Sequence, residues 1–260
     1  MASLIHTEEV FTRFIKYFKD QRNVLKYDQA LTEMINKKQH SLVIDFKDLY
    51  SYNLDLALEL LSNPKEYLNK FDISTHNMLM KKDLDYATKI KYINVRFKNL
   101  LIETPLNILG AQHIGKFVMV KGIINRVSSV RPLLLKSTFQ CNTCGEKIYL
   151  EQKGQYLRTP DECHFCKGQE FELHSNQSSF INYQQISIQE PLVSPFSKQL
   201  NIELLDDIAN ISKSNMLINV IGSLELLIRQ IKGRMLRDFD YFLKANYIEL
   251  LSRNQLNFII

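Results

Sequence analysis

The chain has 260 residues, of which 45% are hydrophobic and 23% charged, an ordinary globular composition that excludes a largely disordered or collagen-like protein. No apolar stretch approaches the roughly 18 residues that span a bilayer, and the N-terminus lacks the basic and apolar regions of a secretory signal. The sequence therefore predicts an intracellular, cytoplasmic protein without a membrane partner.

Positive charge is concentrated in two segments that contain no Asp or Glu, although the net charge is only +5. The segment 104–145 carries Lys116, Lys121, Arg126, Arg131 and Lys136. The segment 226–237 carries Arg229, Lys232, Arg234 and Arg237. Concentrated positive charge attracts a polyanion such as a nucleic acid.

Residues 1–103 are expected to form a small helical bundle. Apolar residues recur at helical spacing after a Thr7 cap, again over Leu54–Leu61, and along a third stretch, Leu84–Leu101. Asn63 and Pro64 are typical of a cap and first position of a further helix. One short β-branched segment, Leu42–Phe46, predicts an edge strand.

The pattern becomes β-rich after residue 103. Five strands are expected, at 117–127, 133–139, 179–188, 216–229 and 235–251. Five strands with one long interruption suit an OB-type barrel. The predicted fold is therefore α+β: a helical bundle (1–103), an OB-fold in two parts (104–139 and 177–260), and an insertion (140–176) that holds every cysteine.

The four cysteines have the spacing of a zinc ribbon. Cys141 and Cys144 form one C-x2-C pair, and eighteen residues later Cys163 and Cys166 form another. Two such turns can close a tetrahedron of thiolates around Zn²⁺. Because cysteine fills all four positions, the site is predicted to be structural rather than catalytic. His164 is interpreted as a loop residue and not as a ligand.

The basic segment 226–237 predicts a β-hairpin that turns at Lys232-Gly233. Pairing Ile231 with Arg234 places Arg229 opposite Leu236. Two interpretations stay open: a surface that contacts phosphates through Arg229, Lys232, Arg234 and Arg237, or a solvated hairpin whose charges only protect an exposed edge. Without aromatic residues at the tip, contacts to the nucleic-acid backbone are favoured over base stacking.

No enzymatic activity is expected of this chain. Gly110–Phe117 matches the first seven positions of a phosphate-binding loop, but Phe117 replaces the required Ser or Thr and a strand follows where a helix should begin. The sequence contains no other glycine-rich phosphate loop, no G-x-S-x-G and no H-E-x-x-H.

Three stretches together resemble the N-terminal region of archaeal MCM (minichromosome maintenance) replicative helicases. His113–Pro132 is similar to the family's "IGK-x-V-x-V-x-G-I-V-x-R-x-S-x-V-R-P" block. After the cysteines, Tyr183–Pro191 resembles its "FQKIRLQE" strand, and Glu203–Asp207 its "LEDDLV" element. The resemblance extends over nearly the whole chain.

The resemblance implies a helical bundle, an OB-fold and an inserted zinc ribbon, assembled into hexamers or head-to-head double hexamers. It implies that the hairpin holds single-stranded or double-stranded DNA in a central channel and that Arg126 and Arg131 contact single strands. It also implies replication factors as partners, a nucleoid location, and a loop that communicates with a C-terminal AAA+ motor. That loop comprises Ser194, Pro195, Phe196, Ser197, Lys198 and Gln199.

The sequence also departs from the family. It ends at Ile260, before the Walker motifs and arginine finger, so we expect either a piece of a longer helicase or a motorless homologue. ATP and Mg²⁺ would act only in the motor, leaving Zn²⁺ as the one cofactor. Ser187 and Leu133 stand where Arg is frequent in relatives. An alternative is an assembly platform that makes protein contacts without significant DNA binding of its own; an unrelated OB and zinc-ribbon factor is a third interpretation.

Overall fold

The computed structural model describes residues 2–90, 92–154, 156–190, 198–231 and 234–251, without the side chains of residues 2–6 and 230–234. It divides into two compact units, each described here by itself. Unit 1 comprises Met1–Ser128, Gln185–Leu204 and Ile211–Ile260, and unit 2 comprises Ser129–Gln184 and Leu205–Asn210. The predicted α+β class is confirmed.

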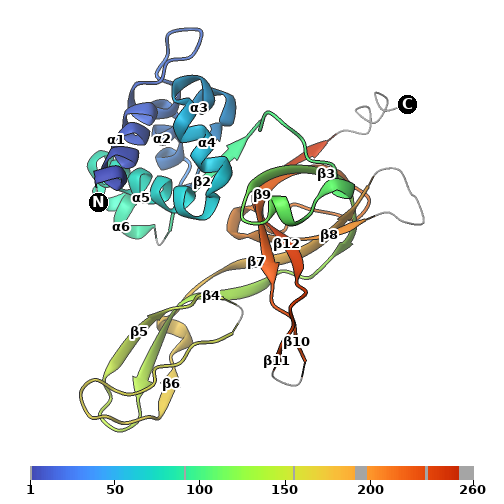
Figure 1. Cartoon of the computed structure of the whole chain (residues 1–260). Helices are drawn as coiled ribbons and strands as arrows, with labels where there is room; N and C mark the ends of the chain where they lie inside the picture. The colour runs from blue at the N-terminus through green and yellow to red at the C-terminus, as the bar shows by residue number, and fades with distance from the viewer. Residues whose placement is uncertain (1, 91, 155, 191–197, 232–233, 252–260) are drawn as a thin grey trace. The chain divides into compact units, whose positions relative to one another are not determined.

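The N-terminal part of unit 1 is mainly helical (Figure 1). Its helices are α1 (Ala2–Tyr17), α2 (Lys26–Asn36), α3 (Phe46–Tyr52), α4 (Leu54–Ser62), α5 (Pro64–Lys82) and α6 (Leu84–Lys89). The prediction for α5 is confirmed, with Asn63 as the cap and Pro64 at the first position. The Thr7 cap is wrong, because α1 begins before that residue. No helix in the described ranges is long and apolar enough to cross a membrane.

The prediction of one helix over Leu84–Leu101 is wrong. Only its first turns are helical, and the chain then forms strand β2 (Asn94–Lys98), which pairs in parallel with β1 (Ser41–Asp45). Ile93, Val95 and Phe97 are buried at a spacing of two residues, which is the period of a strand. Ile93 and Phe97 are four residues apart, so they also fit the spacing of a helix.

Aromatic rings fill the core of the helical part and continue to the barrel of unit 1. Phe11 stacks on Phe71 at a centroid distance of 4.0 Å, and Phe71 lies 5.7 Å from Phe97. Phe97 in turn meets Phe117 edge to face at 6.4 Å. This continuous buried cluster joins the bundle to the outer face of the barrel.

Five strands of unit 1 close into an OB-type barrel. In spatial order they are β3 (Phe117–Val127), β9 (Leu217–Leu227), β12 (Asp240–Leu251), β8 (Gln199–Leu205) and β7 (Ser179–Gln189), and β7 returns to β3. The β12–β8 pair is parallel, whereas β3–β9, β9–β12 and β3–β7 are antiparallel. A Cβ at Gly122 would lie 2.8 Å from the carbonyl oxygen of Gln189, so glycine permits this close approach of β3 and β7.

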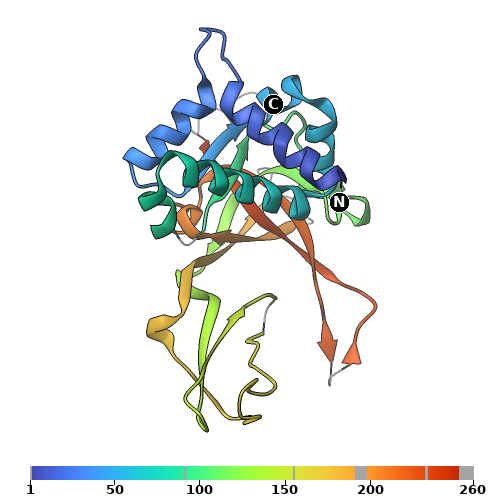
Figure 2. The same cartoon turned by 90° about the vertical axis from the view of Figure 1, so that its left-hand side faces the viewer.

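The hairpin of β10 (Gln230–Ile231) and β11 (Arg234–Met235) extends β9 and β12 beyond the barrel (Figure 2).

Unit 2 contains β4 (Arg131–Cys141), β5 (Lys147–Glu151), β6 (Phe171–Leu173) and the first part of β7. The prediction that residues 133–139 form a barrel strand is wrong. These residues form part of β4, which pairs with β5, β6 and β7. The fifth barrel position belongs to β8 instead, where Leu200, Ile202 and Leu204 alternate into the core.

Candidate metal centre and nucleic-acid interface

The four cysteines of unit 2 come together as their spacing predicts. Their sulfur atoms all lie within 4.8 Å of one another. The Sγ atoms of Cys141 and Cys166 are 3.5 Å apart, and those of Cys144 and Cys163 are 3.6 Å apart. A zinc–sulfur distance of about 2.3 Å requires sulfur–sulfur edges of about 3.8 Å in a tetrahedron. The donor set therefore fits a tetrahedral metal ion, and His164 does not belong to it.

The backbone turns around both cysteine pairs bring amide groups toward sulfur. The amides of Cys144 and Thr143 donate hydrogen bonds to the sulfur of Cys141 and lower the pKa of its thiol to about 6. A lowered pKa favours the thiolate, which is the form that binds metal. Gly145 follows the first turn with φ +77°, and Lys167 adopts φ +63° after the second.

Gly168 has a separate role, which is to leave room for the clustered cysteines. A Cβ at this position would lie 2.7 Å from Oγ1 of Thr143 and 3.2 Å from Sγ of Cys141. Its carbonyl oxygen accepts a hydrogen bond from the amide of Cys163 at 2.8 Å, which closes the second cysteine turn. A side chain here would push the turns apart.

The basic hairpin has the predicted register. Ile231 pairs with Arg234, and the amide of Leu236 donates to the carbonyl of Arg229 at 2.9 Å. Lys232 lies outside the described residues, and of Arg234 the structure describes the backbone. Arg237 is exposed, with no polar partner among the described residues.

Arg229 differs from Arg237 because two carboxylates bind it. Its guanidinium lies 2.6 Å from Asp238 and 3.5 Å from Asp240. Sequence reasoning missed both acids because they lie just beyond the acid-free segment. Across a hairpin, however, the residues that follow the second strand lie beside those that precede the first. A phosphate would have to compete with two carboxylates for Arg229.

Arg126 and Arg131 belong to different units of the structure. Arg126 is exposed on β3, in the stretch that pairs with β7 of unit 1. Arg131 begins β4 in unit 2, opposite Tyr183, and its guanidinium lies 5.7 Å from the centre of that ring. The Arg131–Tyr183 pair was not predicted; the alternation of β7 is the signal that could have shown it.

The predicted communication loop is described only in part. Ser194, Pro195, Phe196 and Ser197 lie outside the described residues. Lys198 donates from Nζ to the carbonyl oxygen of Leu109 at 2.6 Å and lies 5.4 Å from the ring centre of Tyr241. Gln199 is exposed at the start of β8. Lys198 therefore anchors the chain at the entrance to β8.

In Gly110–Phe117, which partly matches a phosphate-binding loop, backbone amides donate hydrogen bonds to other groups of the protein. The amide of Gly110 donates to Nδ1 of His113, and that of Gly115 donates to the carbonyl of Leu224. The amides of His113, Ile114 and Lys116 likewise donate to carbonyl oxygens. Amides bound in this way cannot cradle a phosphate, which agrees with the rejection of this motif.

Two family models match the chain in order. The MCM N-terminal domain matches residues 8–99, and the MCM OB domain matches residues 105–225. A minichromosome maintenance protein MCM of Saccharolobus solfataricus is 28% identical over 95% of this chain and 38% of its own length. The DNA replication licensing factor mcm3 of Schizosaccharomyces pombe is 27% identical over 93% of this chain and 29% of its own length.

The fold has a counterpart among solved structures. The crystal structure of the N-terminal domain of an archaeal MCM superposes with a TM-score of 0.79 at 23% identity, covering 96% of this chain and all of that one. The chain thus spans about a third of the length of the two curated relatives described above.

Proposed function

The chain belongs to the MCM family, whose N-terminal and OB domains it matches, and we propose that it is the DNA-binding and ring-assembly region of an MCM replicative helicase. In this proposal the chain grips DNA phosphates in a central channel and catalyses nothing itself. ATP-driven unwinding, with its ATP and Mg²⁺, would belong to an AAA+ motor domain. The proposed cofactor here is one structural Zn²⁺ on the four cysteines.

The observation that carries the DNA-binding proposal is the geometry of the basic hairpin. Two short antiparallel strands extend β9 and β12, and their register matches the one inferred from the basic sequence. A ribbon of this kind can contact phosphates without exposing the barrel core. Arg234, Arg237 and Lys232 are the proposed phosphate ligands. Arg229 is a weaker one, since Asp238 and Asp240 already bind it. Arg126 and Arg131 are proposed as additional contacts to single strands.

The proposed partners follow from family membership. They are single-stranded or double-stranded DNA, further copies of this chain in a hexamer or double hexamer, the motor domain, and replication factors at the nucleoid. The loop proposed to communicate with the motor domain comprises Ser194, Pro195, Phe196, Ser197, Lys198 and Gln199. These proposals concern the assembled helicase, of which the chain spans one part.

A salt titration tests the DNA-binding proposal. We expect labelled single-stranded DNA to bind with a log–log salt slope of about −0.7 per phosphate contacted. Replacing both Arg234 and Arg237 with Ala should weaken binding and make the slope shallower by about 1.4, measured by fluorescence anisotropy. Lys19→Ala with Arg22→Ala removes the same charge from exposed positions of the bundle and should change neither quantity. An unchanged slope in the hairpin variant contradicts the proposal.

Exposed aromatic side chains in unit 2 favour a second candidate function, the assembly platform. Phe165 and Tyr156 are each 77% exposed and Tyr149 is 70% exposed. Large exposed apolar side chains mark protein contacts more often than phosphate contacts. If Phe165→Ser abolishes oligomers in sedimentation velocity while the native chain fails to bind DNA at low salt, the platform is the correct function. DNA binding that survives loss of the oligomer would favour the first proposal.

A further inference from the structure

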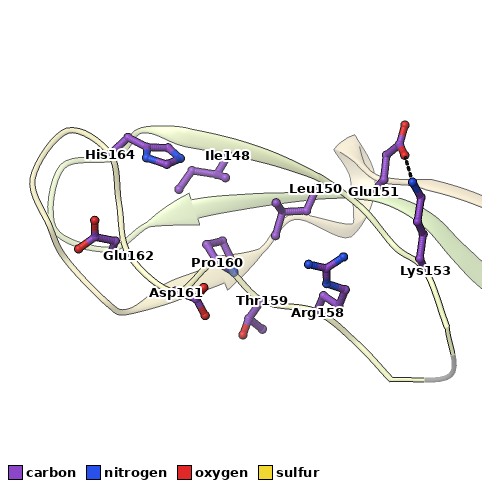
Figure 3. Close-up of a pocket in the computed structure, with 10 residues that line it drawn as sticks. All are labelled: Ile148, Leu150, Glu151, Lys153, Arg158, Thr159, Pro160, Asp161, Glu162 and His164. Carbon is purple, nitrogen blue, oxygen red and sulfur yellow. Dashed lines mark ion pairs between the residues drawn. The ribbon is translucent and has the colours of Figure 1, made fainter. Parts of the chain in front are cut away.

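Unit 2 contains a pocket of about 390 Å³ apart from the cysteine cluster and the proposed DNA contacts (Figure 3). One side is β5, and the other is the segment that returns toward Cys163. The floor is apolar, formed by the half-buried side chains of Ile148, Leu150 and Pro160. In Figure 3 these three residues lie along the middle of the pocket, with charged residues around them.

The pocket is built into the fold, because its outer wall is fixed at both ends. At one end the side chain of Gln152 accepts a hydrogen bond from the amide of Arg158 at 2.8 Å and donates to its carbonyl at 2.9 Å. At the other end Cys163 is fully buried in the cysteine cluster, 3.6 Å from the sulfur of Cys144. The wall is thus held while the space between it and β5 stays open.

Among the charged residues that line the pocket, Arg158 lies beside its apolar floor. Glu151 is 3.1 Å from Lys153, and Glu162 is 2.7 Å from Lys167, so these acids are paired. Among the charged Asp, Glu, Lys and Arg side chains that line the pocket, Arg158 and Asp161 have no polar partner within the part of the chain that the structure describes. In Figure 3 the guanidinium of Arg158 lies beside Leu150, whereas Asp161 extends away from Leu150.

We propose that this pocket binds a short peptide segment of a partner protein, with an aliphatic side chain on Ile148, Leu150 and Pro160 and a carboxylate on Arg158. An arginine binds a carboxylate through two parallel hydrogen bonds, which an apolar floor strengthens by excluding water. A nucleic acid is disfavoured here because its backbone requires several cations, whereas Arg158 is the one lysine or arginine lining the pocket that has no carboxylate partner among the described residues. The inference is independent of DNA binding by the hairpin.

A degenerate peptide array tests the proposal with the whole chain loaded with zinc. The probes are random peptides of about seven residues in which one position at a time is fixed as acidic, basic or aliphatic. The native chain should select an acidic residue next to an aliphatic one. Arg158→Glu should reverse the charge preference toward Lys and Arg, and Arg158→Ala should weaken the best acidic peptide roughly fivefold to tenfold.

A matched control makes the same charge change on β5, which forms one side of the pocket. Lys147 is exposed on β5 and alternates with Ile148, so Lys147→Glu should leave the peptide preference unchanged. Zinc content and the nuclear magnetic resonance spectrum of the backbone amides show whether each variant is folded. With the best peptide, nuclear magnetic resonance shifts should appear at the amides of Ile148, Leu150 and Arg158. Absence of any selection, an unchanged preference in Arg158→Glu, or shifts confined to other residues would overturn the proposal.

Discussion

The side chain of Asn246 accepts a hydrogen bond from the backbone amide of Phe97, at 2.7 Å. Asn246 is the bulged residue of β12, between Ala245 and Tyr247, and its Nδ2 also donates to the carbonyl of Val95 at 2.8 Å. The side-chain amide of Asn246 thus makes two hydrogen bonds with the backbone of β2 that a neighbouring strand would otherwise make. The backbone carbonyl oxygen of Asn246 accepts a hydrogen bond from the side chain of the buried Arg96 at 2.5 Å, which completes the attachment of β2 to the barrel.

Replacing Asn246 with Ala should lower the free energy of unfolding by roughly 2–4 kcal/mol, because it leaves the amide of Phe97 and the carbonyl of Val95 without partners. Urea denaturation followed by circular dichroism measures the change. Asn201→Ala, at an exposed position of β8, is the control and should stay within about 0.5 kcal/mol. Equal stability of the two variants would mean that water replaces the lost amide at β2.

Asp72 should make stability fall as the pH rises. Burial raises the pKa of its carboxyl to about 7, against the opposing effects of the Val95 amide, which donates to Oδ1 at 2.6 Å, and of Arg96. In the unfolded chain the pKa is about 3.9, so the folded state binds the extra proton between these values. The stabilisation is complete below about pH 4 and is lost as the pH rises through about 7, at most about 4 kcal/mol.

The neutral variant Asp72→Asn tests that pH dependence. Subtracting its urea stability from that of the native chain, from pH 4 to 8, removes the contribution of the other carboxyls. The difference should become less favourable to the native chain with rising pH. A difference that does not vary with pH would show that Arg96 keeps Asp72 ionised throughout.

Metal removal should unfold the cysteine-bearing part of unit 2 and leave unit 1 folded. Apart from β4, this region has only the five-residue strand β5 and the three-residue strand β6, so metal binding is expected to be coupled to its folding. Cys144→Ser should bind less zinc and become protease-sensitive at about residues 141–173, as mass spectrometry of the fragments would show. Ser175→Ala, a solvent-exposed change outside the cluster, is the control. Unchanged protease resistance of the apo protein would contradict the expected coupling.

Asp238→Asn should strengthen DNA binding if the hairpin contacts phosphates. The substitution removes the carboxylate 2.6 Å from Arg229 and one negative charge from the hairpin base. We expect a twofold to tenfold gain in affinity at low salt and a smaller gain at high salt, because screening weakens the effect. Asp207→Asn removes an equal charge outside the hairpin sequence and should have less effect. Weaker binding in Asp238→Asn would indicate that the carboxylate orients Arg229 for DNA.

Local spacing predicted the parts of the site that depend on neighbouring residues. The C-x2-C pairs identified the four cysteines, and the glycine turn gave the register in which Arg229 lies opposite Leu236. Both features depend on turns of a few residues, whose geometry is set by the residues within them.

Features that depend on distant partners could not be read in the same way. The apolar residues of β2 also fit a helix, and only pairing with β1 and Asn246, far away in the chain, selects the strand. The choice of β8 rather than residues 133–139 as a barrel strand likewise depends on the parallel pairing with β12. The pairing of Arg229 with Asp240 could not be predicted from the sequence, because the two residues become neighbours only when the hairpin has folded.

The pairing between the end of β3 and the middle of β7 has a consequence for the modular history of this chain. The amide of Ser128 donates to the carbonyl of Gln185 at 2.8 Å, and the amide of Gln185 donates to Oγ of Ser128 at 2.9 Å. The chain therefore leaves the barrel and re-enters it at one pair of adjacent residues. A short turn could join Ser128 to Gln185 without changing the register of the barrel. Evolution could lengthen, trim or exchange everything between these two residues while the barrel kept its fold.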